Sequence, residues 1–292
     1  MISLVRLLVV ILIISAISNI EQTENQTHSH NSDPVNQEPM DLQEAKIVPD
    51  SKEPSLEFVK LPKYRSLDNN SIYSDVLSHS RQNPYGDKHG RYTNVHETAH
   101  GIHSELRNEH QSLFDYPINA FYCLNGNAVI LPEPKIKLRH VSRYIPEILR
   151  SYRHKTYLIE QIKYWDDKPT YLLDEWSCYL LGSECAVDDH SNNMPLEKTD
   201  AISGSLEFSI YSIALAISIK ENDANYWENT PQFKEFVKYN LVRSEKVFNT
   251  GCDIPAFQHK EQDRLREALL KHPDAEPIRT FLKTEFDGIF VD

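Results

Sequence analysis

The chain has 292 residues, of which 40% are hydrophobic and 10% aromatic, so it can bury one sizeable core. Its formal net charge is −12, from 31 Lys and Arg against 43 Asp and Glu. The basic residues are scattered and form no block or stripe. The sequence therefore lacks the electrostatic footprint of a phosphate-binding surface, and we expect no nucleic-acid partner.

Residues 1–18 have the pattern of a secretory signal. Arg6 precedes the apolar run LLVVILIISAI, and the small residues Ala16 and Ser18 lie three before and one before a cut after Ser18. The run is shorter than the roughly 20 residues of a spanning helix. An uncleaved signal anchor is the alternative. Either version places the mature domain outside the cytosol, as a secreted or periplasmic protein with no stable membrane span unless the signal stays uncleaved.

Residues 19–54 are polar, punctuated by proline and almost free of aromatic residues, which is typical of a linker or a removable pro-segment. Beyond them we find no internal repeat and no second shift in composition. Residues 55–292 are therefore predicted to form one domain.

The predicted elements of this domain begin with a strand in 55–62 and a helix over 92–109. Residues 119–134 predict a hairpin with a two-residue turn, because Asn125-Gly126 lies between two apolar runs and an Asn-Gly turn takes positive φ at both positions. The remaining predicted helices are 140–151, 154–165, 171–187, 202–221, 231–248, 259–271 and 276–286, with 210–219 buried nearly all round. The predicted fold class is α+β, predominantly helical with a small β-sheet or hairpin.

The four cysteines, Cys123, Cys178, Cys185 and Cys252, leave two interpretations open. In an exported protein they permit two disulfides, with three pairings that the sequence does not rank. Seven residues on one helix would separate Cys178 from Cys185 by about 10 Å along the axis, which is too far for a bridge. Four buried thiols are the alternative. No CxxC spacing marks them as metal ligands.

The stretch 92–106, YTNVHETAHGIHSEL, carries the motif H-E-x-x-H at His96-Glu97-Thr98-Ala99-His100. Residues four apart share one face of a helix, so His96 and His100 can bind one zinc ion, and Glu97 can act as general base on a water at that ion. An apolar stripe supports the helix: Val95, Ala99, Ile102 and Leu106. Gly101 weakens a helix interior, and a close backbone neighbour would explain it.

The third ligand must come from elsewhere in the chain. His103 lies about 10 Å along the axis from His96, too far for the two rings and His100 to share an ion. We expect it on a polar helix face or lining a cleft. A histidine six residues after His100 is ruled out, because Leu106 occupies that position.

A carboxylate from the helix at 171–187 is the predicted solution. Glu175 lies among large apolar residues, where an acid is costly unless it is paired or coordinated. The alternative is that Asp174 and Glu175 simply favour a helix N-terminus. Asp174, Glu184 and Asp188 are the other candidate ligands.

This arrangement resembles the gluzincin-type zinc metallopeptidases of the zincin superfamily. In them an H-E-x-x-H helix supplies two ligands and the base, and a Glu on a later helix supplies the third ligand. The resemblance implies a zincin-like domain with His96, His100 and Glu175 as zinc ligands and Glu97 as base. It covers only these positions and their two helices. Some members carry an Asp four residues after the ligand Glu, where this chain has Tyr179. Their edge strand usually precedes the active-site helix, whereas the predicted hairpin here follows it, so either 55–62 supplies that strand or the architecture differs.

The implied reaction is hydrolysis of a peptide bond in a peptide or protein substrate, with zinc polarising the carbonyl and Glu97 moving the proton from water to the leaving amine. Tyr171, one turn before Glu175, is the predicted oxyanion donor. Two alternatives remain: a catalytically inactive metal-binding or interaction protein on the same scaffold, and a zinc amidase acting on a non-peptide amide.

Overall fold

The computed structural model describes residues 55–67, 71–81 and 90–292. The predicted signal peptide (1–18) and linker or pro-segment (19–54) lie outside the described residues. Both stay predictions.

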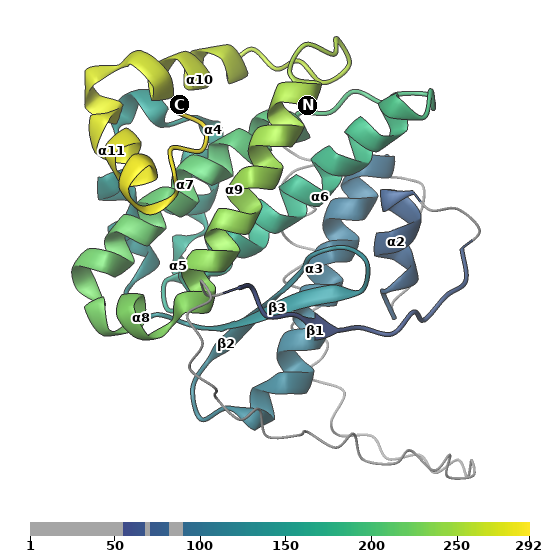
Figure 1. The fold of residues 1–292 in the computed structure, drawn as a ribbon, viewed down its shortest axis with the longest axis horizontal. Helices are drawn as coiled ribbons and strands as arrows, with labels where there is room; N and C mark the ends of the chain where they lie inside the picture. The colour runs from purple at the N-terminus through teal and green to yellow at the C-terminus, as the bar shows by residue number, and fades with distance from the viewer. Residues whose placement is uncertain (1–54, 68–70, 82–89) are drawn as a thin grey trace. The chain divides into compact units, whose positions relative to one another are not determined.

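The described residues form a helical protein with one small sheet (Figure 1). The strands are β1 (Val59–Lys60), β2 (Ile118–Tyr122) and β3 (Asn127–Pro132). The main helices are α3 (Arg91–His110), α6 (Tyr171–Ser191), α7 (Ala201–Asn222), α9 (Pro231–Gly251), α10 (Gln262–Lys271) and α11 (Glu276–Glu285). Shorter helices are α2 (Ile72–Ser78), α4 (Tyr152–Lys155), α5 (Ile162–Trp165) and α8 (Ala224–Asn229). The predicted α+β class, with far more helix than sheet, is confirmed.

The sheet is antiparallel with strand order β1-β3-β2. Asn127 N donates to Leu124 O (3.0 Å), closing a turn in which Asn125 and Gly126 both have positive φ, as their sequence predicted. Leu124 also has positive φ, and because Cys123 N donates to Asn127 O the connection holds three residues, one more than the predicted two-residue turn. β2 packs against α3. The edge strand beside α3 therefore follows that helix in the chain, which departs from the order usual in the gluzincins.

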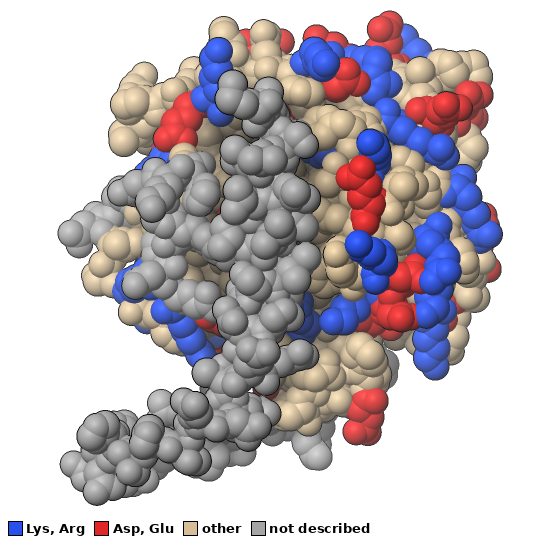
Figure 2. Space-filling model, turned by 180° about the vertical axis from the view of Figure 1, so that it is seen from behind, with Lys and Arg blue, Asp and Glu red and all other residues tan. Residues whose placement is uncertain are grey.

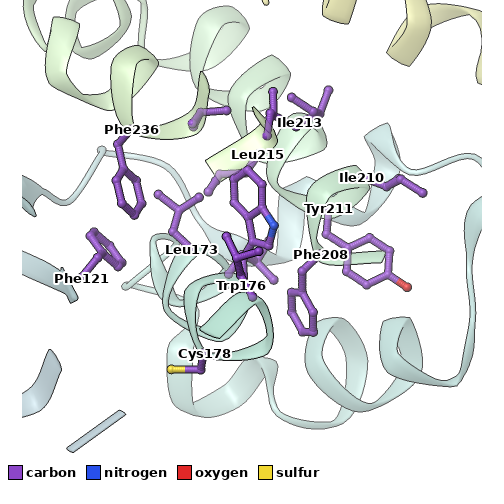
Figure 3. Packing of buried hydrophobic residues seen from close by; sticks show 14 of the residues in the cluster. Phe121, Leu173, Trp176, Cys178, Phe208, Ile210, Tyr211, Ile213, Leu215 and Phe236 are labelled. Atoms are coloured by element: carbon purple, nitrogen blue, oxygen red, sulfur yellow. The ribbon is translucent and has the colours of Figure 1, made fainter. Parts of the chain in front are cut away.

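The helices share one hydrophobic core with the sheet. α6 packs on α3, α7 and α9, and Figure 1 shows α6 and α9 side by side. Trp176 is fully buried near the centre of this core, where Leu173 and Leu215 lie beside it (Figure 3). Its indole N–H donates to Ser244 Oγ (2.9 Å), so a large polar-tipped side chain is buried without an unpaired donor. α6, which would supply a metal ligand, is thus fixed from three sides.

α7 confirms the predicted helix at 202–221, and its run 210–219 is buried almost completely. Among the described helices it is the one long and apolar enough to cross a membrane, yet the whole of that apolar stretch is buried in the fold. This is the setting of a core helix.

Two predicted helices are wrong or broken. Residues 138–149 form two 3₁₀ segments, Leu138–Tyr144 and Glu147–Leu149, and not a helix over 140–151. Pro146 separates them because it lacks an N–H and disfavours a helical residue before it. The predicted helix over 154–165 is interrupted by a π-helical turn at Thr156–Glu160. Sequence periodicity also missed α2 and α8, which are too short to show it and begin at the capping residues Ser71 and Asp223.

All four cysteines lie within the described residues as free thiols, and three of them are buried. No disulfide forms, so of the two interpretations the structure supports free thiols.

Figure 2 shows acidic and basic side chains interspersed over the part of that face not covered by residues outside the description. No patch of one sign is visible there. This agrees with the scattered charges of the sequence.

Candidate metal centre

α3 holds the H-E-x-x-H motif with its predicted stripe turned inward. Val95, Ala99, Ile102 and Leu106 are each at most 5% exposed, which confirms the stripe. The side chains of His96 and His100 project beside it and keep 15% and 17% of their surface. The two imidazoles therefore lie at the boundary between core and solvent, where a bound ion could meet a substrate.

α6 approaches α3 closely at a glycine. A Cβ added at Gly182 would lie 3.2 Å from Tyr92 O and 3.9 Å from His96 Cβ. Gly101, in contrast, has no described atom within 4 Å of an added Cβ, so the close neighbour that would have explained this glycine is not found among the described residues. The glycine that lets the two helices approach lies on α6, and it brings Glu175 opposite the histidines.

The three predicted ligands converge. His96 Nε2 and His100 Nε2 are 3.1 Å apart, and each lies 3.7 Å from Glu175 Oε2. A triangle with these sides has its centre about 2.0 Å from every corner, which is the length of zinc bonds to His nitrogen and carboxylate oxygen. The spacing of the donor atoms thus suits one ion, and they are one of two groups with metal-binding geometry among the described residues.

The two carboxylate oxygens of Glu175 have different surroundings. Oε1 accepts a hydrogen bond from the Tyr171 hydroxyl (2.6 Å). Oε2 is buried without a hydrogen-bond partner in the described part of the chain. A buried carboxylate oxygen with no partner is costly, so a cation at the centre of the triangle would satisfy it.

Tyr171 therefore has a different position from the one we predicted for an oxyanion donor. Its hydroxyl is buried and also lies 2.8 Å from Gln161 Oε1. Because it carries one proton and donates that proton to the carboxylate, it orients Glu175 and is not available to a substrate.

Asp174 contacts the histidines from the other side. Its Oδ1 accepts from His100 Nδ1 (2.6 Å) and from His103 Nδ1 (3.0 Å). With the Nδ1 proton of His100 held in this bond, the lone pair of a neutral His100 is on Nε2 and faces Glu175. Asp174, which we considered as an alternative ligand, instead orients the ring of His100. This contact supplies the orienting carboxylate that Tyr179 cannot provide.

The remaining candidates are used elsewhere. Glu184 forms a two-bond ion pair with Arg243 (2.9 and 2.6 Å), and Asp188 accepts from the backbone N–H of Ile72 (3.1 Å). His103 is fully buried, so the expectation of a polar face or cleft wall is wrong for it.

The electrostatics of the histidine pair favour one shared positive charge. Burial lowers the pKa of His96 well below its usual value, and His100 lowers it further. Burial also acts to lower the pKa of His100, but Cys178, Glu175 and Asp174 outweigh it and raise that pKa well above its usual value. A cation at the Nε2 atoms would replace this proton, because a ligating imidazole must be neutral.

Glu97 is 8% exposed and lies next to the first histidine on α3. Burial raises the pKa of its carboxyl; His100 opposes this and Glu175 adds to it. A raised carboxyl pKa suits a general base that must accept and then release a proton near neutral pH.

Two further tyrosines border the site. The ring of Tyr179 meets the ring of His96 edge-on with centroids 4.6 Å apart, and its hydroxyl lies 3.2 Å from that of Tyr157. Tyr157 belongs to the π-helical turn, a feature that recurs at functional sites. Both rings are half-buried. Sequence spacing pointed to neither of them, since one is placed by the irregular turn and the other by helix contact.

A buried ion pair supports the Tyr179 ring from behind. The Arg153 guanidinium lies 5.0 Å from the ring centroid, donates to Glu207 Oε1 (2.8 Å) and pairs with Asp200 (2.7 Å). Both Arg153 and Glu207 are fully buried. With its charge balanced by two acids, Arg153 acts on the site through Tyr179 and not by direct contact with solvent.

The sequence matches no protein-family model, and comparison with curated proteins and solved structures finds no match either. The interpretation of the site therefore rests on its own geometry.

Proposed function

We propose that this protein is an exported zinc-dependent metallopeptidase. The observation that carries the proposal is the triangle of His96 Nε2, His100 Nε2 and Glu175 Oε2, whose centre lies one zinc bond length from each atom. Two imidazoles and one carboxylate form a donor set of catalytic zinc sites, which leave a further position for water or substrate. Calcium and magnesium prefer oxygen ligands alone, so the two nitrogens favour zinc.

In this proposal each side chain of the site has its own part in peptide-bond hydrolysis. When bound, zinc would act as a Lewis acid toward a carbonyl and a water molecule. The carboxylate of Glu97 would accept a proton from the attacking water and deliver it to the leaving amine as the C–N bond breaks. Asp174 would hold the ring of His100 in position.

Oxyanion stabilisation would come from Tyr157 or Tyr179. Their hydroxyls are paired with each other at 3.2 Å beside His96, and a hydroxyl at this place could instead donate to a developing oxyanion. Tyr171 is replaced in this role because its proton is held by Glu175.

The test begins with metal analysis of the full chain. Parent protein and Glu97→Gln should each hold one zinc per chain, whereas His96→Ala and Glu175→Ala should lose it. Parent cleavage of a broad peptide library should stop on chelation and return with added zinc. In Glu97→Gln the rate should fall about 100- to 10,000-fold, the usual contribution of a general base.

Glu109→Gln is the matched control. Glu109 lies on the same helix, is exposed, and pairs with Arg81 at the surface. It should cleave at the parent rate. Zinc binding without cleavage of any peptide would indicate a non-catalytic metal-binding protein, and cleavage confined to non-peptide amides would indicate an amidase. Equal cleavage by Glu97→Gln and the parent would rule out Glu97 as the base.

A further inference from the structure

His103 is a buried histidine that the proposed chemistry does not use. It lies one turn beyond His100 on α3, has no exposed surface, and packs its ring against Phe121 at 5.9 Å between centroids. Its Nδ1 donates to Asp174 Oδ1 (3.0 Å), while its Nε2 is buried with no partner among the described residues. An unpaired buried nitrogen costs stability. Packing alone therefore does not account for a histidine here.

Asp174 receives its hydrogen bonds unevenly. Oδ1 accepts from His100, from His103 and, at 3.7 Å, from the Cys178 thiol, whereas Oδ2 is 4.0 Å from the Arg107 guanidinium. Arg107 is held away from the carboxylate, since it donates to Asn119 Oδ1 (3.1 Å) and Ser104 Oγ (3.3 Å). The two imidazole donors converge on one oxygen and hold that oxygen beside His100.

We propose that His103 is a positioning residue that holds Asp174 so that Asp174 can orient the imidazole of His100 toward the ion. This inference rests on the proposed zinc site and adds a residue to it. Without the His103 donor, Asp174 can rotate toward Arg107 and its bond to His100 weakens. His100 then loses both the fixed ring orientation and the fixed Nδ1 proton that present Nε2 to the centre of the triangle.

Three substitutions in the full chain separate this role from a purely structural one. His103→Asn keeps a donor, because the Asn side-chain nitrogen can occupy the place of Nδ1. His103→Gln extends its amide toward the place of Nε2, away from Asp174. His103→Leu removes the donor and the unpaired nitrogen together. Zinc affinity is measured by competition with a chelator, and stability by unfolding of the metal-free protein.

We expect zinc affinity to fall about 10- to 100-fold in His103→Leu and His103→Gln and to stay within about threefold of the parent in His103→Asn. Stability should follow another order, with His103→Leu at least as stable as the parent and His103→Asn less stable because it leaves space unfilled. If affinity simply follows stability across the three variants, His103 is only a packing residue and the proposal is overturned.

A second readout needs no metal. In the metal-free parent, the Nδ1 proton of His100 should exchange slowly with solvent in nitrogen-15-edited spectra, and this protection should fall at least tenfold in His103→Leu but persist in His103→Asn. Unchanged protection in His103→Leu would overturn the proposal even if the parent binds zinc. If the parent binds no zinc but protection of the His100 Nδ1 proton still falls in His103→Leu, the positioning role is supported while the zinc proposal fails.

Metal stoichiometry decides one further alternative. His103, Asp174 and Cys178 also belong to the second group with metal-binding geometry, which shares His100. If the parent binds two zinc ions and His103→Asn binds one, His103 is itself a ligand, and its role as a positioning residue is overturned.

Discussion

Substitution of Gly182 by alanine tests whether the close approach of α3 and α6 sets the ligand triangle. The new Cβ would lie 3.2 Å from Tyr92 O, against about 3.5–4.0 Å for an unstrained contact. Both atoms are held by helical backbone, so relief requires the helices to separate by about 0.3 Å or more. The two sides from Glu175 to the histidines would then lengthen from 3.7 Å to about 4.0 Å.

This change moves the centre of the triangle from about 2.0 Å to about 2.2 Å from each donor, the edge of the roughly 0.2 Å tolerance of zinc bonds. We expect zinc affinity to fall about tenfold, equivalent to about 1.4 kcal/mol. The unfolding free energy of metal-free Gly182→Ala should change by less than about 1 kcal/mol, because alanine's helix preference offsets the strain.

Gly101→Ala is the control. It lies on α3 next to His100, and an added Cβ there meets nothing within 4 Å. It should raise stability by about 0.5–1 kcal/mol and leave zinc affinity unchanged. Chelator competition and denaturant unfolding measure both quantities. If Gly182→Ala and Gly101→Ala bind zinc equally well, the helix separation does not control the site and this reasoning fails.

Three further predictions concern other parts of the fold. In Gly204→Ala the new Cβ would come within 2.3 Å of the Tyr179 ring, so we expect Tyr179 to be displaced from His96 and peptide cleavage to fall at least tenfold, as steady-state kinetics would show. Burial lowers the pKa of His154 to about 4, below its unfolded value of about 6.5. Its contribution to stability is therefore present above pH 6.5 and lost as the pH falls toward 4, by about 1–2 kcal/mol, because solvent screens part of the effect. His154→Gln should flatten that part of the stability profile in denaturant titrations. The four cysteines should react as free thiols in the unfolded protein without reductant, and a reductant should leave the mass unchanged.

Hydrophobic periodicity and turn sequences predicted the helices and the turn whose conformation depends on neighbouring residues in the chain. The stripe on α3 and the apolar run of α7 are buried as their periodicity indicates, and the Asn125-Gly126 turn has the predicted positive φ. The failed helix over 140–151 also had a local signal, Pro146, which should have limited it. The π-helical turn at 156–160 had no such signal.

The residues of the site also differ in whether local sequence patterns predict their positions. The spacing of His96 and His100 on one helix predicts their convergence, since a helix places residues four apart on one face. The position of Glu175 depends on a helix 75 residues further along the chain, and only its apolar surroundings and the family resemblance indicated it. The burial of His103 and the hydrogen bond of Tyr171 depend on tertiary contacts that no spacing within one helix reveals.

The sequence offered the neighbouring acids Asp174 and Glu175 as alternatives for one ligand position, but in the structure both lie close to His100. Consecutive residues on a helix point about 100° apart, so treating the two carboxylates as rivals for one ligand position assumed that only one could face α3. An imidazole, however, presents two nitrogens on different edges of its ring. Asp174 reaches Nδ1 of His100 at 2.6 Å, while Glu175 lies 3.7 Å from Nε2 of the same ring. A single turn of α6 can therefore supply one carboxylate that orients His100 and another that faces its second nitrogen, because the two acids reach different edges of the same ring.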